Sequence, residues 1–287
     1  MRFRGKMTES PCIKQFINVV NTVARMSKTC VIRIAKNNLF FIANEGGGIA
    51  KSPMLWTQLE QGHFFNEFQM EGVTPENNEI FLELQLDKLS RTLNSLKLAQ
   101  GARTLKIKLT KRHTPCLTLE AELTSGSIHD RFVVHDVPVQ LIPRRQWHIY
   151  DEPAMSQFQT SILMPPLRHL RTVVDHMKSL SAHISVAANE IGTFVVSVSN
   201  DKVDIATYFR GLLTPKFVDS QERSSTSNRE ELHSATVDIK KFALFLQGEQ
   251  LNPTKAICNV VSGRLLHLFL VNDDVTLQYY LPASSYV

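Results

Sequence analysis

The sequence predicts an α+β fold made of two copies of one unit, because the order of its strand-like and helix-like segments repeats. The first half runs as strand, helix, several strands, helix and three strands, and the second half returns to this order. Val19-Val20 corresponds to Val173-Val174 at an offset of 154 (173 − 19), and Leu89 corresponds to Phe242 at an offset of 153 (242 − 89). Two landmarks that agree within one residue indicate an internal duplication.

A strand-like stretch near the middle of the chain separates the two copies. Residues 129–141 alternate between unlike faces with the period of two that is typical of a strand. Pro138 interrupts this strand, and Pro143 ends it. We therefore expect an N-terminal domain over 1–142, a connecting loop over 143–159 and a C-terminal domain over 160–287.

The first predicted helix has an apolar side and a basic, amide-bearing side. Ser10 and Pro11 suit its cap and first turn. On a helical wheel, Ile13, Phe16, Ile17, Val20, Val23 and Ala24 share one side, and the other side carries Lys14, Asn18, Asn21, Thr22, Arg25 and Lys28.

The later helices repeat this division with decreasing clarity. The second helix begins near Asp87 and places Arg91 and Asn94 opposite its leucines. The third follows Pro165-Pro166 and sets Arg168, Arg171, Asp175 and Lys178 against an apolar face formed by Leu167, Leu170, Val173, Val174, Met177 and Leu180. The fourth begins with Lys240 and Lys241, but its apolar residues spread around the wheel.

Composition indicates an ordinary globular protein with a modest positive charge. Formal net charge is +5, and the pI is near 9.0. This balance permits contact with nucleic acid without establishing it. No apolar run approaches a membrane span and the N-terminus lacks a signal-peptide core, so we expect a soluble, intracellular protein with no membrane contact.

Residues that could carry catalysis or bind metal are not arranged for it in the sequence. Cys12, Cys30, Cys116 and Cys258 show no C-x-x-C spacing and are expected to be buried thiols. The run of three glycines at 46–48 lacks the Gly-Lys-Ser/Thr of a phosphate loop. The histidine pairs 129/135 and 169/176 have no nearby third ligand, so we expect no metal, no cofactor and no enzymatic activity. A metal-dependent nucleic-acid enzyme is the distant alternative.

Two surface features can also be predicted from the residues alone. The segment 214–233 is polar and rich in serine, and we expect a long mobile loop. Basic stripes on equivalent helices would gather on one surface in a duplicated fold. Because duplex DNA carries a phosphate charge every ~1.7 Å, such a surface would bind it without reading sequence.

Long blocks of the chain resemble the DNA sliding clamps, and within them the Hus-one subunits of the heterotrimeric nine-one-one DNA-damage checkpoint clamp. The blocks are MRFRGKM, KTCVIRI, FFNEFQMEGVTPENNEI, LSRTL, ARTLKIKLT, VVHDVPVQLIPRRQW, NPTKAICNVV and DVTLQYYLPA. The resemblance implies two clamp domains, each with antiparallel sheets outside and two helices lining a central channel. It is weakest at 43–53, 151–159 and 214–233.

The resemblance also implies roles for three groups of residues. DNA-facing positions correspond to Lys14, Arg25, Lys28, Arg91, Arg168, Arg171, Lys178, Lys240 and Lys241. Subunit contacts correspond to two edge strands, about 128–134 and 203–209, with Ile128, Arg131, Phe132, Val134, Val203, Ile205, Tyr208 and Phe209. A partner-peptide pocket corresponds to Leu141, Ile142, Pro143, Tyr279, Tyr280 and Pro282, although core packing of the two tyrosines fits the sequence equally well.

The function that the resemblance implies is that of a non-enzymatic clamp subunit. It would join two different clamp subunits in a ring around double-stranded DNA at damage sites or primer–template junctions. A clamp loader, together with checkpoint and repair proteins bound through peptide motifs, would be its further partners, and its location would be nuclear, with a cytoplasmic pool. A replication-type processivity clamp is the alternative, which the basic pI disfavours.

Overall fold

The structure is a computed structural model that describes residues 1–44, 46, 48–98, 102–123, 131–154, 157–215 and 229–284. Contacts divide the chain into two compact units. Unit 1 comprises 1–44, 55–152 and 274–276, and unit 2 comprises 45–54, 153–273 and 277–287. The part of the expected mobile loop at 216–228 lies outside the described residues.

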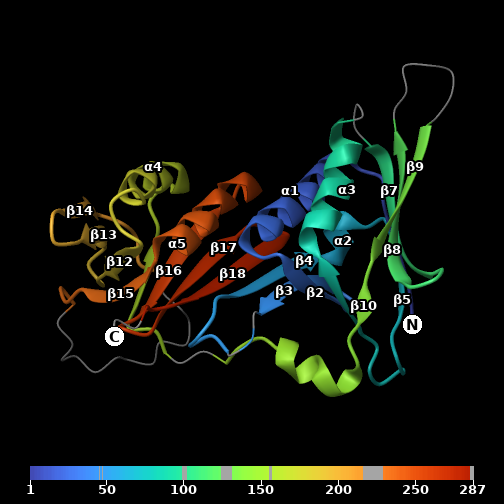
Figure 1. Ribbon diagram of the computed structural model, residues 1–287, viewed down its shortest axis with the longest axis horizontal. Helices are drawn as coiled ribbons and strands as arrows, with labels where there is room; N and C mark the ends of the chain where they lie inside the picture. Colours follow the sequence, from blue (N-terminus) through green and yellow to red (C-terminus); the bar gives the residue numbers. More distant parts are fainter. Residues whose placement is uncertain are drawn as a thin grey trace. The chain divides into compact units, whose positions relative to one another are not determined.

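Unit 1 contains two antiparallel sheets and two long helices (Figure 1). One sheet has the strand order β5-β1-β7-β8-β9, and in the other the strands of this unit follow the order β10-β6-β2-β3-β4. The elements are β1 (Arg2–Met7), α1 (Ser10–Met26), β2 (Thr29–Ile34), β3 (Asn38–Asn44), β4 (Met54–Glu60), α2 (Gln61–Phe64), β5 (Glu67–Glu71), β6 (Ile80–Gln85), α3 (Leu86–Leu98), β7 (Ala102–Lys111), β8 (Pro115–Leu123), β9 (Arg131–Pro138), β10 (Gln140–Leu141) and the 3-10 helix η1 (Arg144–Tyr150).

Unit 2 repeats this plan with shorter helices. Its strands follow the orders β14-β13-β12-β15 and β18-β17-β16-β11. The elements are β11 (Thr160–Leu163), α4 (Leu167–Met177), β12 (His183–Ala188), β13 (Phe194–Ser199), β14 (Asp204–Phe209), β15 (His233–Asp238), α5 (Ile239–Leu246), the 3-10 helix η2 (Gln247–Leu251), β16 (Lys255–Val261), β17 (Leu265–Val271) and β18 (Val275–Pro282).

Equivalent strands pair in the same way in both units. The pairs β1–β7, β2–β3, β2–β6 and β7–β8 of unit 1 reappear as β11–β16, β12–β13, β12–β15 and β16–β17 in unit 2. Of the residues that gave the offset, all are buried except Val173, which is half-buried. The predicted repeat of the order of elements is therefore confirmed, and the strand pairing repeats with it.

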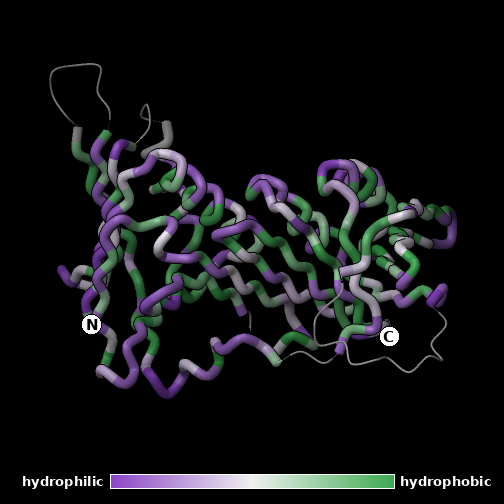
Figure 2. The backbone as a smooth tube through the Cα atoms, turned by 180° about the vertical axis from the view of Figure 1, so that it is seen from behind, coloured by the Kyte–Doolittle hydropathy of each residue, from purple (hydrophilic) through white to green (hydrophobic). Residues whose placement is uncertain are grey.

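Burial follows the period of two that the sequence shows. β1 and β12 bury every second residue, and Figure 2 shows hydrophilic and hydrophobic residues alternating along the strands. In unit 1 the core lies where both sheets meet the helices. Side chains of α1, α3, β2 and β7, including Phe16, Leu89, Ile34 and Ile107, line one small apolar cavity there.

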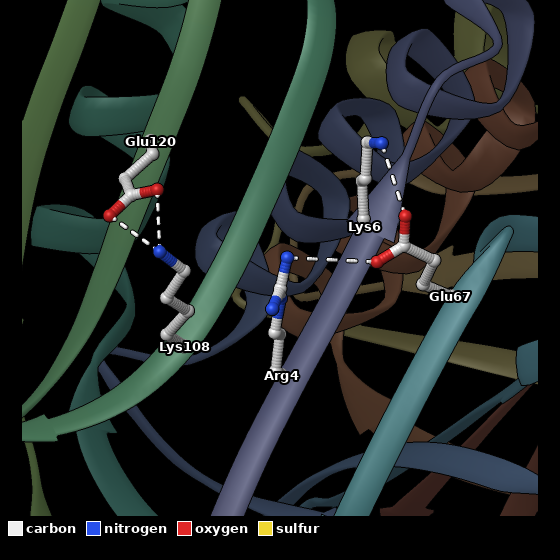
Figure 3. A network of polar contacts seen from close by, with 5 residues as sticks. All are labelled: Arg4, Lys6, Glu67, Lys108 and Glu120. Atoms are coloured by element: carbon white, nitrogen blue, oxygen red, sulfur yellow. Dashed lines mark hydrogen bonds and ion pairs between the residues drawn. The ribbon is translucent and has the colours of Figure 1, made fainter.

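The outer face of the β9-containing sheet is held by charged pairs between neighbouring strands. Arg4 and Lys6 of β1 both reach Glu67 of β5, and Lys108 of β7 reaches Glu120 of β8 (Figure 3). Opposite charges on adjacent strands stabilise the register modestly, because they are solvent-accessible. The face that carries them is polar, which leaves the opposite face for the core.

Unit 1 extends to Glu152, ten residues beyond the expected boundary at 142 (152 − 142). The reason is that η1 packs on the sheet instead of crossing freely between domains. Trp147 stacks on Phe81 with ring centroids 4.5 Å apart, and its indole N–H donates to the Ile142 carbonyl at 3.0 Å. Arg33, bound by Glu79 at 2.7 Å, also lies against the ring of Phe81.

Two predicted helix caps are shifted. Glu9 occupies the N-cap of α1, so Ser10 is the first helical residue, although Pro11 lies in the first turn as expected. α3 begins at Leu86, so Asp87 is inside the first turn, where its carboxylate interacts favourably with the positive end of the helix dipole. Asp238 does act as a cap, since its side chain accepts from the Lys241 N–H at 3.0 Å at the start of α5.

Candidate DNA-facing helices and subunit edges

α1 buries its predicted apolar face except at Ala24, which is half-buried, and exposes the basic residues that were predicted for the other face. Its buried residues include Phe16, Val20 and Val23. Lys14 and Arg25 on the helix, and Lys28 just after it, are exposed. The apolar periodicity alone gives this result, because residues three and four apart share a helix face.

The polar side of α1 is narrower than the wheel predicts. Thr22 is only 1% exposed and donates its hydroxyl hydrogen to the Asn18 carbonyl. Asn21 turns toward α3, where its amide and that of Asn94 donate to each other at 2.9 and 3.0 Å, and Ser90 donates to Asn21 at 2.7 Å. Asn94, placed on the solvent side by the sequence, therefore joins α1 to α3 instead.

α3 exposes Arg91 as expected, and it adds one basic residue that the sequence reasoning missed. Arg91 lies 3.5 Å from the Asp87 carboxylate one turn earlier, and its side chain is 82% exposed. Lys88 is also exposed. Its position three residues before Arg91 is the signal that could have found it, because residues at that spacing lie on the same side of a helix.

α4, together with Lys178 directly after it, carries a group of charged side chains on its exposed side. Arg168, Arg171 and Lys178 are exposed, and Leu167, Leu170, Val174 and Met177 are buried. Asp175 lies among the basic residues and accepts from Lys178 at 2.7 Å. The predicted apolar face departs from burial at two positions, since Val173 is half-buried and Leu180 is 37% exposed.

α5 is short and less basic than α4. Lys240 is exposed, whereas Lys241 is half-buried and its N–H is used by the Asp238 cap. The helix buries Phe242, Ala243, Phe245 and Leu246. Burial on several sides explains why its apolar residues spread around the wheel.

β9 is the last strand of its sheet and exposes apolar side chains at that edge. Phe132 is 70% exposed and Val134 is 53% exposed. Both lie on the outer face, since they stand opposite Glu122 and Glu120 of β8. The predicted contact residue Ile128 lies outside the described residues, as does the side chain of Arg131.

β14 is an end strand of a sheet in unit 2. It pairs with β13, and the sheet order ends there. Tyr208 is 57% exposed, Ile205 is 37% exposed, and Val203 and Phe209 are half-buried. Arg210 lies 5.9 Å from the Tyr208 ring, which gives this edge an aromatic and cationic character.

The backbone hydrogen bonds show which residues of β9 face away from its sheet. Val139 donates to Pro115 at 3.0 Å, and this pair continues the β8–β9 register. Because hydrogen-bonded and non-bonded pairs alternate along antiparallel strands, odd-numbered residues of β9 bond to β8. The backbone groups of Phe132, Val134 and Asp136 therefore point outward, and Pro138 has no N–H to offer on that side.

The same reasoning applies to β14. Asn200 donates to the Val203 carbonyl at 3.0 Å in register with the β13–β14 pairs, so odd residues bond to β13. The outward groups belong to Asp204, Ala206 and Tyr208. Each edge thus offers three outward-facing residues, at alternate positions, to an added strand.

The six residues of the expected peptide pocket fall in different environments of the two units. In unit 1, Leu141 is half-buried, Ile142 is buried and Pro143 is exposed. In unit 2, Tyr279 and Tyr280 are only 2% and 1% exposed, and Pro282 is half-buried. Tyr279 stacks on Phe245 of α5 and Tyr280 on His267, so the structure shows the core-packing role for both tyrosines.

The cysteines are buried and free, as predicted. Burial raises the pKa of the Cys258 thiol to about 12 and also raises that of Cys30, so neither forms a thiolate readily. Among the residues that the structure describes, no group of three or more His, Cys, Asp or Glu side chains could hold a metal ion. Within the same ranges, no helix is both long and apolar enough to span a bilayer.

Two units of paired helices and antiparallel sheets, each repeating the same strand pairing, define the sliding-clamp fold. A solved structure of proliferating cellular nuclear antigen from Entamoeba histolytica is similar to this chain, with a TM-score of 0.70 and 12% sequence identity. The alignment covers 99% of this chain and 99% of the antigen's chain. At this identity the match concerns the fold alone.

The sequence comparison is more specific. The family of Hus1-like proteins matches residues 1–285. Human Checkpoint protein HUS1 is 42% identical, with coverage of 99% of this chain and 100% of the human protein. Checkpoint protein Hus1-like of Drosophila melanogaster is 30% identical, with coverage of 99% of each. The chain belongs to the Hus1-like protein family.

Proposed function

We propose that this chain is one subunit of a checkpoint sliding clamp, a ring that encircles duplex DNA and recruits signalling and repair proteins. The single observation that carries the proposal is that β9 and β14 are end strands of their sheets, each with outward backbone groups and exposed apolar side chains. An exposed edge of this kind is a template for pairing with another chain. In the ring, each edge pairs with a strand of a neighbouring subunit.

The two edges are chemically different, so the neighbour at each edge would be bound through a different surface. β9 offers Phe132 and Val134 on its outer face, whereas β14 offers Tyr208 beside Arg210. Contacts between unlike surfaces are head-to-tail, and such contacts close a ring when the rotation allows it. We infer a heterotrimer in which this chain joins two other clamp subunits.

The basic side chains of the helices supply the DNA contact in this proposal. Lys14, Arg25 and Lys28 of unit 1 are exposed, as are Arg168 and Arg171 of unit 2. Flexible cations hold phosphates without reading bases, so the contact is sequence-independent and weakens with salt. Lys88 joins the predicted set.

The remaining partners follow from the family resemblance and stay proposals. A loader would open the ring, and repair and checkpoint proteins would dock by short peptides near Leu141–Pro143. Because Tyr279 and Tyr280 are buried, the half-exposed segment after β10 is the better candidate for the docking surface. DNA as the ligand implies a nuclear location, and the proposed role requires no catalysis.

Charge reversal on the helices tests the DNA-binding role. The triple variant Arg25→Glu, Lys28→Glu, Arg171→Glu, assembled with its partner subunits, should bind duplex DNA more weakly. Its salt dependence should also flatten, by about 0.9 in logarithmic slope for each phosphate that the variant no longer neutralises. Fluorescence anisotropy across a salt titration measures both quantities.

A matched control has the same change in net charge away from these helices. Lys36, Lys255 and Arg264 are exposed and lie outside α1, α3, α4 and α5, so their reversal to Glu should leave the salt slope unchanged. If both triple variants weaken binding equally, net charge is responsible and the helices are not the DNA-facing surface. If the first variant fails to assemble, those residues are structural.

A further inference from the structure

One acidic side chain interrupts the basic surface of α4. Asp175 projects from the exposed side of the helix, with 41% of its side chain accessible. It lies between Arg171, four residues earlier, and Lys178, three residues later, and both spacings bring side chains onto the same helix side.

Each carboxylate oxygen of Asp175 is used by a different cation. Oδ1 accepts from Lys178 Nζ at 2.7 Å, and Oδ2 lies 3.6 Å from Arg171 Nε. The two basic side chains are 37% and 44% exposed, so they remain within reach of an external phosphate. Two of the three basic residues that we assign to DNA contact on α4 are thus already paired.

We propose that Asp175 is a positioning residue that restrains Arg171 and Lys178 and so limits how tightly α4 holds DNA. This inference rests on the proposed function and assigns a role within the same surface. A phosphate that approaches these cations must displace the carboxylate, and it meets the carboxylate's own negative charge. Because exposed ion pairs are weak, displacement is possible, but the net gain per phosphate is reduced.

Unit 1 contains a similar ion pair on one helix, with a single basic partner. Asp87 lies one turn before Arg91 on α3, with 3.5 Å between carboxylate and guanidinium. A carboxylate therefore pairs with proposed DNA-contacting cations in each unit. The consequence for a ring is a loose grip that lets it move along the duplex.

The test replaces the carboxylate by its neutral isostere. Asp175→Asn keeps the side-chain shape and has similar helix propensity, so the fold is retained. In the assembled complex, duplex DNA binding by anisotropy should tighten, and the logarithmic salt slope should steepen by about 0.9 to 1.8, one phosphate for each released cation.

Two further variants separate local release from net charge. Glu190→Gln makes the same charge change at a carboxylate that lies 4.0 Å from Arg229, off the helices, and should leave the slope unchanged. In a background of Arg171→Gln and Lys178→Gln, adding Asp175→Asn should no longer steepen the slope, because the released cations are absent.

The outcomes for this inference and for the proposed function are distinguishable. If the Arg25, Lys28, Arg171 reversal weakens binding but Asp175→Asn behaves as wild type, the role of Asp175 is wrong and DNA binding by the helices stands. Equal effects of Asp175→Asn and Glu190→Gln would also overturn it. If the charge reversal has no effect either, the DNA-facing surface itself is wrong.

Discussion

The surroundings of His267 in unit 2 determine the protonation of its imidazole ring. Its ring is stacked on Tyr280, at a centroid distance of 4.6 Å, and on Phe158, at 5.4 Å. Its two nitrogens lie 2.9 Å from the Asn259 amide nitrogen and 2.9 Å from Gln278 Oε1. The amide N–H donates to Nδ1, so Nε2 carries the proton of a neutral ring.

This environment makes the folded protein sensitive to acid. Burial lowers the pKa of His267 from 6.5 to about 4, although the hydrogen bond to Gln278 opposes the shift. Above pH 6.5 the ring is neutral in both states. Between pH 6.5 and about 4, the unfolded chain takes up a proton that the folded chain refuses, so stability falls as pH falls. The loss amounts to about 3 kcal/mol.

We expect His267→Gln to remove most of this pH dependence. Measured by urea unfolding, the stability lost between about pH 7 and pH 4.5 should be smaller for the variant than for wild type by about 2–3 kcal/mol. At neutral pH the variant should be less stable than wild type, because it lacks the stacked ring. His113→Gln, at an exposed histidine, is the control and should lose as much stability between the two pH values as wild type does. Identical pH profiles for His267→Gln and wild type would contradict the assignment.

At the scale of elements, the proposed intersubunit role of β9 can be tested by placing proline at each of two neighbouring residues, one with an outward N–H and one with an N–H that faces β8. Val134→Pro removes an N–H that points away from the sheet, so the chain should fold with stability within about 1 kcal/mol of wild type. The same change deletes one hydrogen bond of the proposed intersubunit ladder. Pull-down with the partner subunit at this edge should therefore fail.

His135→Pro is the matched comparison one residue later. Its N–H faces β8, opposite Leu119, so proline there leaves a ladder carbonyl unpaired and costs about 1–3 kcal/mol in a urea melt. If Val134→Pro unfolds the chain while His135→Pro does not, the outward and inward residues of β9 have been exchanged. Normal partner binding by Val134→Pro would show that this edge is not the interface.

Most elements could be predicted from the sequence, because the patterns that indicate them are local. α1 and α4 follow from apolar residues at helical spacing, and β9 follows from alternation that Pro138 interrupts. Pro138 also limits how far an added strand could pair with β9, because its missing N–H falls on the outward side.

Other features depend on contacts between distant residues and could not be predicted from local patterns. Asn94 meets Asn21 across two helices, and Trp147 anchors η1 by stacking on Phe81. The sequence pattern around Tyr279 and Tyr280 is the same whether these residues line a pocket or pack in the core. Which of the two roles they have depends on the strands that pair with β18 and on the helix α5 that packs against it, and tertiary packing sets both.

At the scale of the whole molecule, β9 and β14 are two unlike end strands among those of the described sheets. β9 of unit 1 and β14 of unit 2 occupy non-equivalent places in the repeat, because β9 corresponds to β18 and β14 corresponds to β4. A chain with non-equivalent edges is suited to head-to-tail closure. Membership of the Hus1-like family and the sliding-clamp fold both agree with a ring subunit.

Native mass spectrometry of this chain co-expressed with two candidate clamp subunits tests the central claim most directly. We predict a single complex whose mass equals one copy of each of the three chains, and its loss when Val134→Pro removes one edge. A ring of three copies of this chain, or a chain that stays monomeric beside an assembled pair of the other two, would contradict the account.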